Sequence, residues 1–142
     1  MWPSQNTESC TLKGSLNKVN IPCVPQTAPK HEGANNTSKT LQLALLNVRS
    51  LAGKIFLIND LITEHTLDFM FLTETWLDQN NSAAVLIEST PPGYSFISEA
   101  RVSRRGGGVA VLFNESFQCM QLSPGSFQSF EYMAIEYMES CF

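Results

Sequence analysis

Apolar residues begin to recur in regular patterns at about residue 40 of the chain. Residues 41–48 form a nearly continuous apolar run, which is typical of a buried strand. In residues 54–65, isoleucines recur three and four positions apart, a spacing that predicts a helix. Residues 67–73 form a second apolar run. The pattern therefore predicts a strand–helix–strand unit in which the two strands run parallel.

Shorter apolar segments follow, separated by turn residues. A helical turn is expected at 83–88, and strands are expected at 94–98 and 109–113. Residues 117–122 are expected to pair back on the preceding strand, and residues 130–137 to form a last, buried strand. A last strand without a partner on one side leaves an edge that favours aggregation.

Residues 1–39 differ from the rest in composition. They contain four prolines, many serines, threonines and asparagines, and no apolar run. Such a segment buries too little apolar surface to offset the entropy lost on ordering. We therefore expect a disordered lead-in at 1–39 and one α/β domain at 40–142.

The formal net charge is −4, of which residues 1–39 contribute +2, so residues 40–142 carry −6. DNA-binding surfaces are usually basic, so this balance argues mildly against DNA binding. The local exception is a predicted loop with Arg101, Arg104 and Arg105. Arg104 and Arg105 are candidates for weak phosphate contacts, although a solvated loop is the favoured interpretation.

Several classes of protein are disfavoured. Cys10, Cys23, Cys119 and Cys141 show no metal-ligand spacing and are interpreted as free thiols. The N-terminus lacks the pattern of a signal peptide. No apolar run reaches the roughly 18 residues that a membrane span needs. We expect an intracellular protein that is not secreted and does not enter a membrane; nucleus and cytoplasm are not distinguished.

Two polar residues stand where the predicted parallel strands end. Asn47 closes the first strand and Glu74 follows the second. Sites in open α/β sheets gather at the carboxyl ends of strands. A carboxylate beside an amide oxygen suits Mg²⁺, which often takes few protein ligands and keeps several waters. On this pattern alone, the plainer interpretation is favoured, in which Asn47 turns the chain and Glu74 is solvated.

Three segments carry a resemblance to a known family. They read Leu-Leu-Asn-Val-Arg-Ser-Leu at 45–51, Leu-Thr-Glu-Thr-Trp-Leu at 72–77, and Arg-Gly-Gly-Gly-Val-Ala-Val-Leu at 105–112. In this order and spacing they resemble the endonuclease/exonuclease/phosphatase superfamily. The residues of the three segments are most similar to those of the apurinic-type endonuclease of LINE (non-LTR) retrotransposons. The resemblance extends over residues 41–137.

The resemblance implies a fold and a chemistry. The fold is the N-terminal half of a four-layer α/β sandwich, in which two sheets pack face to face with helices outside. The chemistry is Mg²⁺-dependent hydrolysis of phosphodiesters, which in the retrotransposon nicks target DNA. Asn47 then corresponds to a residue that helps to hold metal and phosphate, and Glu74 to the principal metal ligand. Glu131 matches a position where the family tends to keep an acidic residue, and no role is assigned to it.

The chain also departs from the family. A tyrosine-bearing segment, a Gly-Asp-x-Asn segment and a closing Ser-Asp-His segment are absent from the sequence. His31 and His65 are interpreted as surface residues that do not replace the missing base. We therefore expect no activity from this chain alone. Two alternatives stay open: a non-catalytic interaction protein, and a non-functional truncated retrotransposon copy. Trp76 could stack on a base, but packing beneath the site loop is favoured.

Overall fold

The structure is a computed structural model that describes residues 16–22, 40–101, 106–123 and 131–140. These residues form seven strands and two helices: β1 (Leu16–Pro22), β2 (Thr40–Asn47), α1 (Ile55–His65), β3 (Phe69–Thr73), α2 (Ser82–Ser89), β4 (Tyr94–Glu99), β5 (Val109–Asn114), β6 (Phe117–Gln121) and β7 (Ile135–Glu139). The fold is therefore mixed α/β, with both helices between β2 and β4 in the chain.

Five of the strands form one sheet, in the order β1-β2-β3-β5-β4. β2 and β3 are parallel, with α1 between them in the chain, so the predicted strand–helix–strand unit is confirmed. β5 pairs antiparallel with both β3 and β4. In the parallel pair, Asn47 lies opposite Thr73, so β2 and β3 end at the same rim of the sheet.

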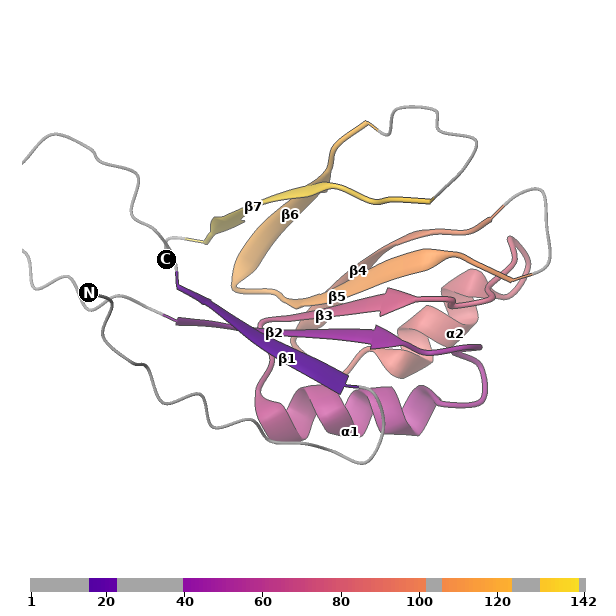
Figure 1. The fold of residues 1–142 in the computed structure, drawn as a ribbon, viewed down its shortest axis with the longest axis horizontal. Coiled ribbons are helices and arrows are strands. Elements are labelled where there is room, and N and C mark those ends of the chain that lie inside the picture. The colour runs from indigo at the N-terminus through magenta and orange to yellow at the C-terminus, as the bar shows by residue number, and fades with distance from the viewer. Residues whose placement is uncertain (1–15, 23–39, 102–105, 124–130, 141–142) are drawn as a thin grey trace, which may run out of the picture.

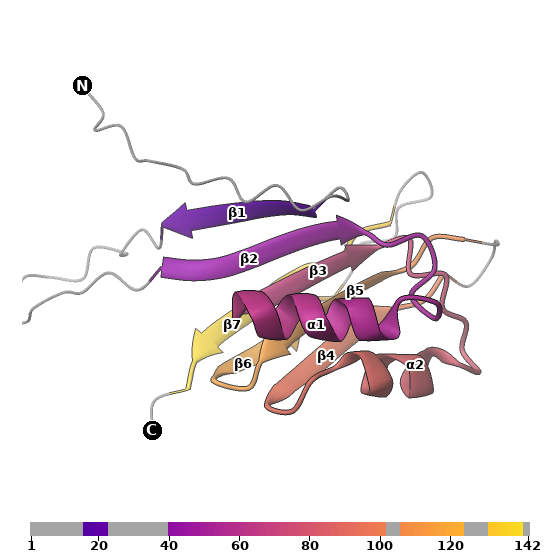
Figure 2. The same ribbon diagram turned by 90° about the horizontal axis from the view of Figure 1, so that it is seen from below.

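The two faces of this sheet are covered differently. Figures 1 and 2 show α1 and α2 on one face and the two-stranded sheet of β6 and β7 over the other. Alternate residues of β3 serve the two sides, because successive side chains of a strand point to opposite faces. Met70 and Leu72 pack toward the helices, and Phe69 packs toward β6. The described residues thus make three layers, and the fourth layer of the sandwich stays a prediction.

The helix side holds the larger apolar cluster. Ile58 and Ile62 of α1 and Leu86 of α2 are buried against the sheet, together with Ala44, Met70, Leu72, Ala110 and Leu112. The predicted helical spacing of the isoleucines is therefore the face that packs on the strands. Within the ranges that the structure describes, neither helix is long and apolar enough to cross a membrane.

The other face is held by aromatic packing around Phe69, which is 1% exposed. Its ring centroid lies 5.0 Å from that of Phe117 in β6 and 5.1 Å from that of Tyr137 in β7. Phe113 of β5 lies 6.4 Å away. Phe69 therefore joins the two-stranded sheet to the five-stranded one.

The segment expected to be a disordered lead-in contains a strand. β1 pairs antiparallel with β2 over seven residues, from Leu16 opposite Leu46 to Pro22 opposite Thr40. The alternation of Val19 and Ile21 with asparagines is the pattern of an edge strand, and it is too short to stand out from its polar surroundings. Proline is tolerated at such an edge because one side of the strand makes no ladder hydrogen bonds.

The last two strands also differ from the expectation. β6 does not pair back on β5, since β5 already has β3 and β4 on its two edges; it pairs with β7. β7 is shifted toward the C-terminus of the expected strand, and most of it is exposed rather than buried. Tyr137 keeps 43% of its surface exposed while one side packs on Phe69. A hairpin lying on one sheet face buries only its inner side.

Replacing the central aromatic residue tests this arrangement. Phe69→Ala should lower the free energy of unfolding by about 3–5 kcal/mol, as expected for a large aromatic side chain removed from a core. Phe56→Ala is the matched control, because Phe56 lies on α1 with 84% of its surface exposed. Its effect should stay within about 0.5 kcal/mol. Urea denaturation measures both, and equal losses would contradict the packing described.

Candidate functional site

Backbone pairing continues past the ends of the two parallel strands. The N–H groups beyond β2 donate to carbonyl oxygens beyond or at the end of β3: Val48 to Thr73 at 2.9 Å, Ser50 to Glu74 at 2.9 Å and Leu51 to Thr75 at 3.0 Å. The two connections that leave the rim are therefore held against each other, and the residues at the rim have fixed positions.

Asn47 and Glu74 lie at this rim, as the sequence predicts. Asn47 is the last residue of β2 and Glu74 immediately follows β3. By strand alternation, Asn47 shares its sheet face with Leu43 and Leu45, the face that β6 and β7 partly cover. Its side chain is exposed. Their positions match the sequence pattern, and their chemical roles stay a prediction.

The connection after β2 has an uncommon backbone that a lysine supports. Arg49 and Ser50 have φ of 43° and 73°, in the left-handed region that side chains rarely adopt. The Lys54 ammonium donates to the carbonyl oxygens of Val48 and Arg49, both at 2.7 Å, and of Ser50 at 3.3 Å. These charge-assisted bonds offset part of the conformational cost.

The carboxylate of Glu74 is held by two donors on one oxygen. The indole N–H of Trp76 donates to Oε2 at 2.8 Å, and the backbone N–H of Gly107 donates to the same atom at 3.3 Å. These hydrogen bonds lower the pKa of Glu74 from its usual value, burial opposes them to a lesser degree, and Arg101 and Arg49 help least. Both hydrogen bonds therefore favour the ionised carboxylate, and within the described part of the chain no donor contacts Oε1.

The glycine run, residues 106–108, lies directly against this rim. The N–H groups of Thr75 and Trp76 donate to the carbonyl oxygens of Gly108 and Gly107 at 3.2 and 2.9 Å. Gly108 has φ of +86°, and a Cβ built there would lie 2.5 Å from the Thr75 hydroxyl oxygen. A larger residue fits neither the dihedral angle nor the space, which accounts for glycine at this position.

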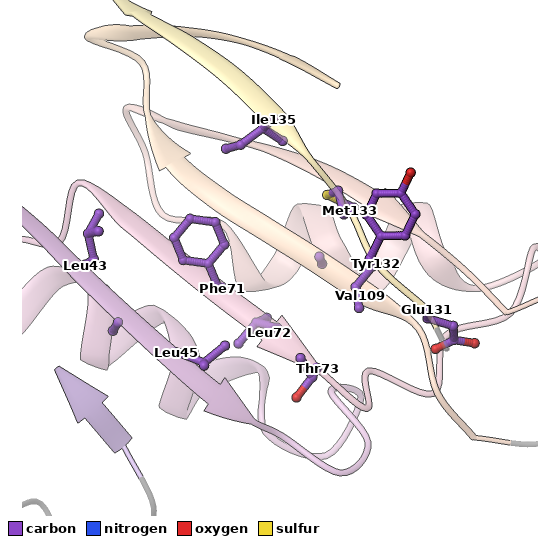
Figure 3. A pocket seen from close by; sticks show the side chains of 12 residues that line it. Leu43, Leu45, Phe71, Leu72, Thr73, Val109, Glu131, Tyr132, Met133 and Ile135 are labelled. Carbon is purple, nitrogen blue, oxygen red and sulfur yellow. The ribbon is translucent and has the colours of Figure 1, made fainter. Parts of the chain in front are cut away.

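A second carboxylate supports the same run from the other side. Glu131 accepts the N–H of Gly108 at 2.9 Å through Oε2, and its Oε1 forms an ion pair with Arg101. Figure 3 shows Glu131 and Thr73 among the side chains of a pocket of about 450 Å³, whose other labelled residues are mostly apolar. Its apolar part lies between β2, β3 and the segment that leads into β7.

One of the sequence-based expectations is untested, one is wrong and one is confirmed only in part. Arg104 and Arg105 lie outside the described residues. Trp76 does not pack beneath the loop, because 49% of its surface is exposed and its indole N–H donates to the Glu74 carboxylate. His65 is only partly exposed, and its Nε2 is buried without a hydrogen-bond partner. His65 is the last residue of α1, an 11-residue helix about 16 Å long. The first residue of this helix follows the connection that leaves the rim.

Sequence reasoning missed the residues that hold the site together. Lys54 acts on carbonyl oxygens four to six residues earlier, and no motif signals such a contact. Glu131 lies 23 positions from Gly108 in the chain. The only sign in the sequence that Glu131 matters was the family's preference for an acidic residue at this position. That preference does not say which group the carboxylate contacts.

Two side chains at the rim carry oxygen atoms that a Mg²⁺ ion could reach. Glu74 offers a carboxylate with one oxygen that no donor among the described residues contacts, and Asn47 offers an exposed amide on the neighbouring strand. Across the described ranges, no group of three or more His, Cys, Asp or Glu side chains could hold a metal ion. Mg²⁺ often binds through one or two protein oxygens and keeps its waters, so the two residues suit it as a weak, hydrated site.

Comparison with known proteins shows a likeness in structure. No protein-family model and no curated protein sequence matches the chain. An AP endonuclease from Leishmania major superposes with a TM-score of 0.51 and 20% identity, over 68% of this chain and 32% of that one. An AP endonuclease from Archaeoglobus fulgidus gives a TM-score of 0.42 and 22% identity, over 51% of this chain and 27% of that one. The first likeness shows that the fold is shared, and the chain spans about a third of that protein's length.

The hydrogen bond from Trp76 makes a measurable prediction. Trp76→Phe removes the largest single influence that lowers the pKa of Glu74, so that pKa should rise toward its usual value. An NMR titration of the labelled Glu74 carboxyl carbon measures the change. Trp2→Phe, the same substitution at the other tryptophan, serves as the control. An unchanged midpoint in the Trp76 variant would contradict the described contact.

Proposed function

We propose that the chain is the N-terminal part of a Mg²⁺-dependent DNA endonuclease of the LINE retrotransposon kind, and that it does not cleave DNA by itself. The observation that carries the proposal is the rim, where parallel pairing brings Asn47 and an ionised Glu74 to the ends of adjacent strands. The shared fold with an AP endonuclease and the family motifs at 45–51, 72–77 and 105–112 support it.

Two residues of the rim would hold the metal ion. Glu74 Oε1 and the side-chain oxygen of Asn47 would hold the ion, and water would complete its coordination. A bound Mg²⁺ supplies polarisation of a phosphoryl oxygen and charge stabilisation of the leaving group. The hydrogen bonds from Trp76 and Gly107 favour the ionised Glu74 carboxylate and orient it through Oε2. Arg49 lies close enough to lower the pKa of Glu74 slightly, and its positive charge would also favour a bound phosphate.

The histidine that the structure describes, His65, lies away from the rim. Water must lose a proton to attack a phosphodiester, and a base has to lie within hydrogen-bond reach of that water. His65 ends α1, about one helix length of 16 Å from the connection that follows β2. Loss of one member of a catalytic group costs nearly as much activity as loss of them all. Nicking by this chain alone should therefore be undetectable.

One observation favours the alternative, that the chain is a non-catalytic interaction protein. Met120, Leu122, Tyr137 and Met138 are large apolar residues exposed on or next to β6 and β7. Exposed apolar surface favours association with a partner. A protein with only this role has no reason to bind Mg²⁺ through Glu74, so metal binding distinguishes the two functions.

Calorimetric titration with Mg²⁺ tests the proposal. The wild-type chain should bind weakly, and Glu74→Gln should weaken the affinity at least about tenfold, since losing a direct ligand should cost no less than losing an outer partner. Asn47→Ala should show a smaller loss in the same direction. Glu88→Gln, an exposed carboxylate on α2, is the matched control.

A plasmid-nicking assay with the same preparations completes the test. No Mg²⁺-dependent nicking is expected from any of them. Three results would overturn the proposal: no binding of Mg²⁺ by the wild-type chain, an affinity that Glu74→Gln leaves unchanged, or nicking that persists through purification and depends on Mg²⁺.

A further inference from the structure

We infer that Glu131 is a positioning residue, which fixes the glycine run so that Gly107 and Trp76 can hold the Glu74 carboxylate. The inference rests on the proposed function of the rim and adds to it a residue from the far end of the described chain. Glu131 touches neither Asn47 nor Glu74 in any hydrogen bond described, so it would act through the backbone between them.

The contacts form a short chain of hydrogen bonds. Glu131 Oε2 accepts the N–H of Gly108 at 2.9 Å. The preceding N–H, that of Gly107, donates to Glu74 Oε2 at 3.3 Å. Two carboxylates therefore bind adjacent N–H groups of one backbone segment. The two N–H groups belong to successive peptide units joined at the Gly107 Cα, so a shift of that segment would change both bonds.

The fit at Gly107 is close enough to transmit such a shift. A Cβ built on Gly107 would lie 2.7 and 2.9 Å from the two carboxylate oxygens of Glu131. Glu131 thus lies directly against the backbone, with φ of +75° at Gly107. The carbonyl of Gly107 also accepts the N–H of Trp76 at 2.9 Å, and the Trp76 indole donates to Glu74. Both donors to Glu74 are therefore tied to the segment that Glu131 holds.

Arg101 limits what else Glu131 can do. Its guanidinium pairs with Oε1, so both carboxylate oxygens of Glu131 already have partners. The two side chains are 35% and 30% exposed, which leaves them partly shielded from water. A carboxylate that is engaged at both oxygens is suited to orienting its neighbours rather than to binding a metal ion.

Three substitutions separate an acceptor role from a charge role. Glu131→Gln keeps an oxygen at the same reach and removes the charge. Glu131→Asp keeps the charge and shortens the side chain by one methylene, so the carboxylate no longer reaches Gly108. Glu131→Ala removes both. Glu136→Ala, an exposed glutamate on β7, is the matched control.

The first readout is the Trp76 indole cross-peak in ¹H–¹⁵N spectra of the full chain, which has only one other tryptophan. Glu131→Asp and Glu131→Ala should move this peak and the Gly107 amide peak, whereas Glu131→Gln and Glu136→Ala should leave them near their wild-type positions. The second readout is Mg²⁺ affinity, which should fall about tenfold or more in the Asp and Ala variants.

The outcomes are distinguishable from failure of the proposed function. If the wild-type chain does not bind Mg²⁺, the proposed function fails, and the indole peak still tests the positioning role. The inference is overturned if Glu131→Asp matches wild type while Glu131→Gln moves the peaks, since the charge would then be the active feature. It is also overturned if all variants resemble the control. If Glu131→Ala does not fold, the Asp and Gln pair decides alone.

Discussion

The candidate site depends on a backbone ladder that continues beyond the parallel strands β2 and β3. Hydrogen bonds from Val48, Ser50 and Leu51 to the chain after β3 bind the two outgoing connections together. A parallel pair brings strand ends to one rim, but without these bonds the residues after the ends could diverge. With them, Asn47 and Glu74 are held on neighbouring strands, and the remaining contacts of the rim refine this arrangement.

The rim combines an unfavourable backbone with strong polar support. Arg49, Ser50, Glu74 and Trp76 all have positive φ, each at a cost of about 1–3 kcal/mol. Lys54 satisfies carbonyl oxygens on one side, and the glycine run pairs with the other. Such strain persists only where neighbouring structure enforces it, and it is found most often at functional sites. This is an independent reason to regard the rim, rather than the apolar pocket, as the site.

Local patterns in the sequence predicted the helices and strands whose formation depends on residues close together in the chain. The spacing of the isoleucines predicted α1, and the apolar runs predicted β2 and β3 with the parallel pairing that the structure has. Contacts between distant segments could not be read in this way. β1 pairs with β2 across a long connection, and Glu131 meets Gly108 from 23 positions away. The motifs located Asn47 and Glu74, whereas the partners that hold Glu74 ionised became visible only in three dimensions.

Hydrogen exchange on the purified chain, with and without millimolar Mg²⁺, tests the central claim most directly. Amides of β2 and β3 should be protected in both conditions, because these strands lie inside the five-stranded sheet. Mg²⁺ should slow exchange further at the rim alone, around residues 47–51, 73–76 and 107–108. Rapid exchange throughout, or protection at the rim that is the same with and without Mg²⁺, would contradict a folded metal-binding rim.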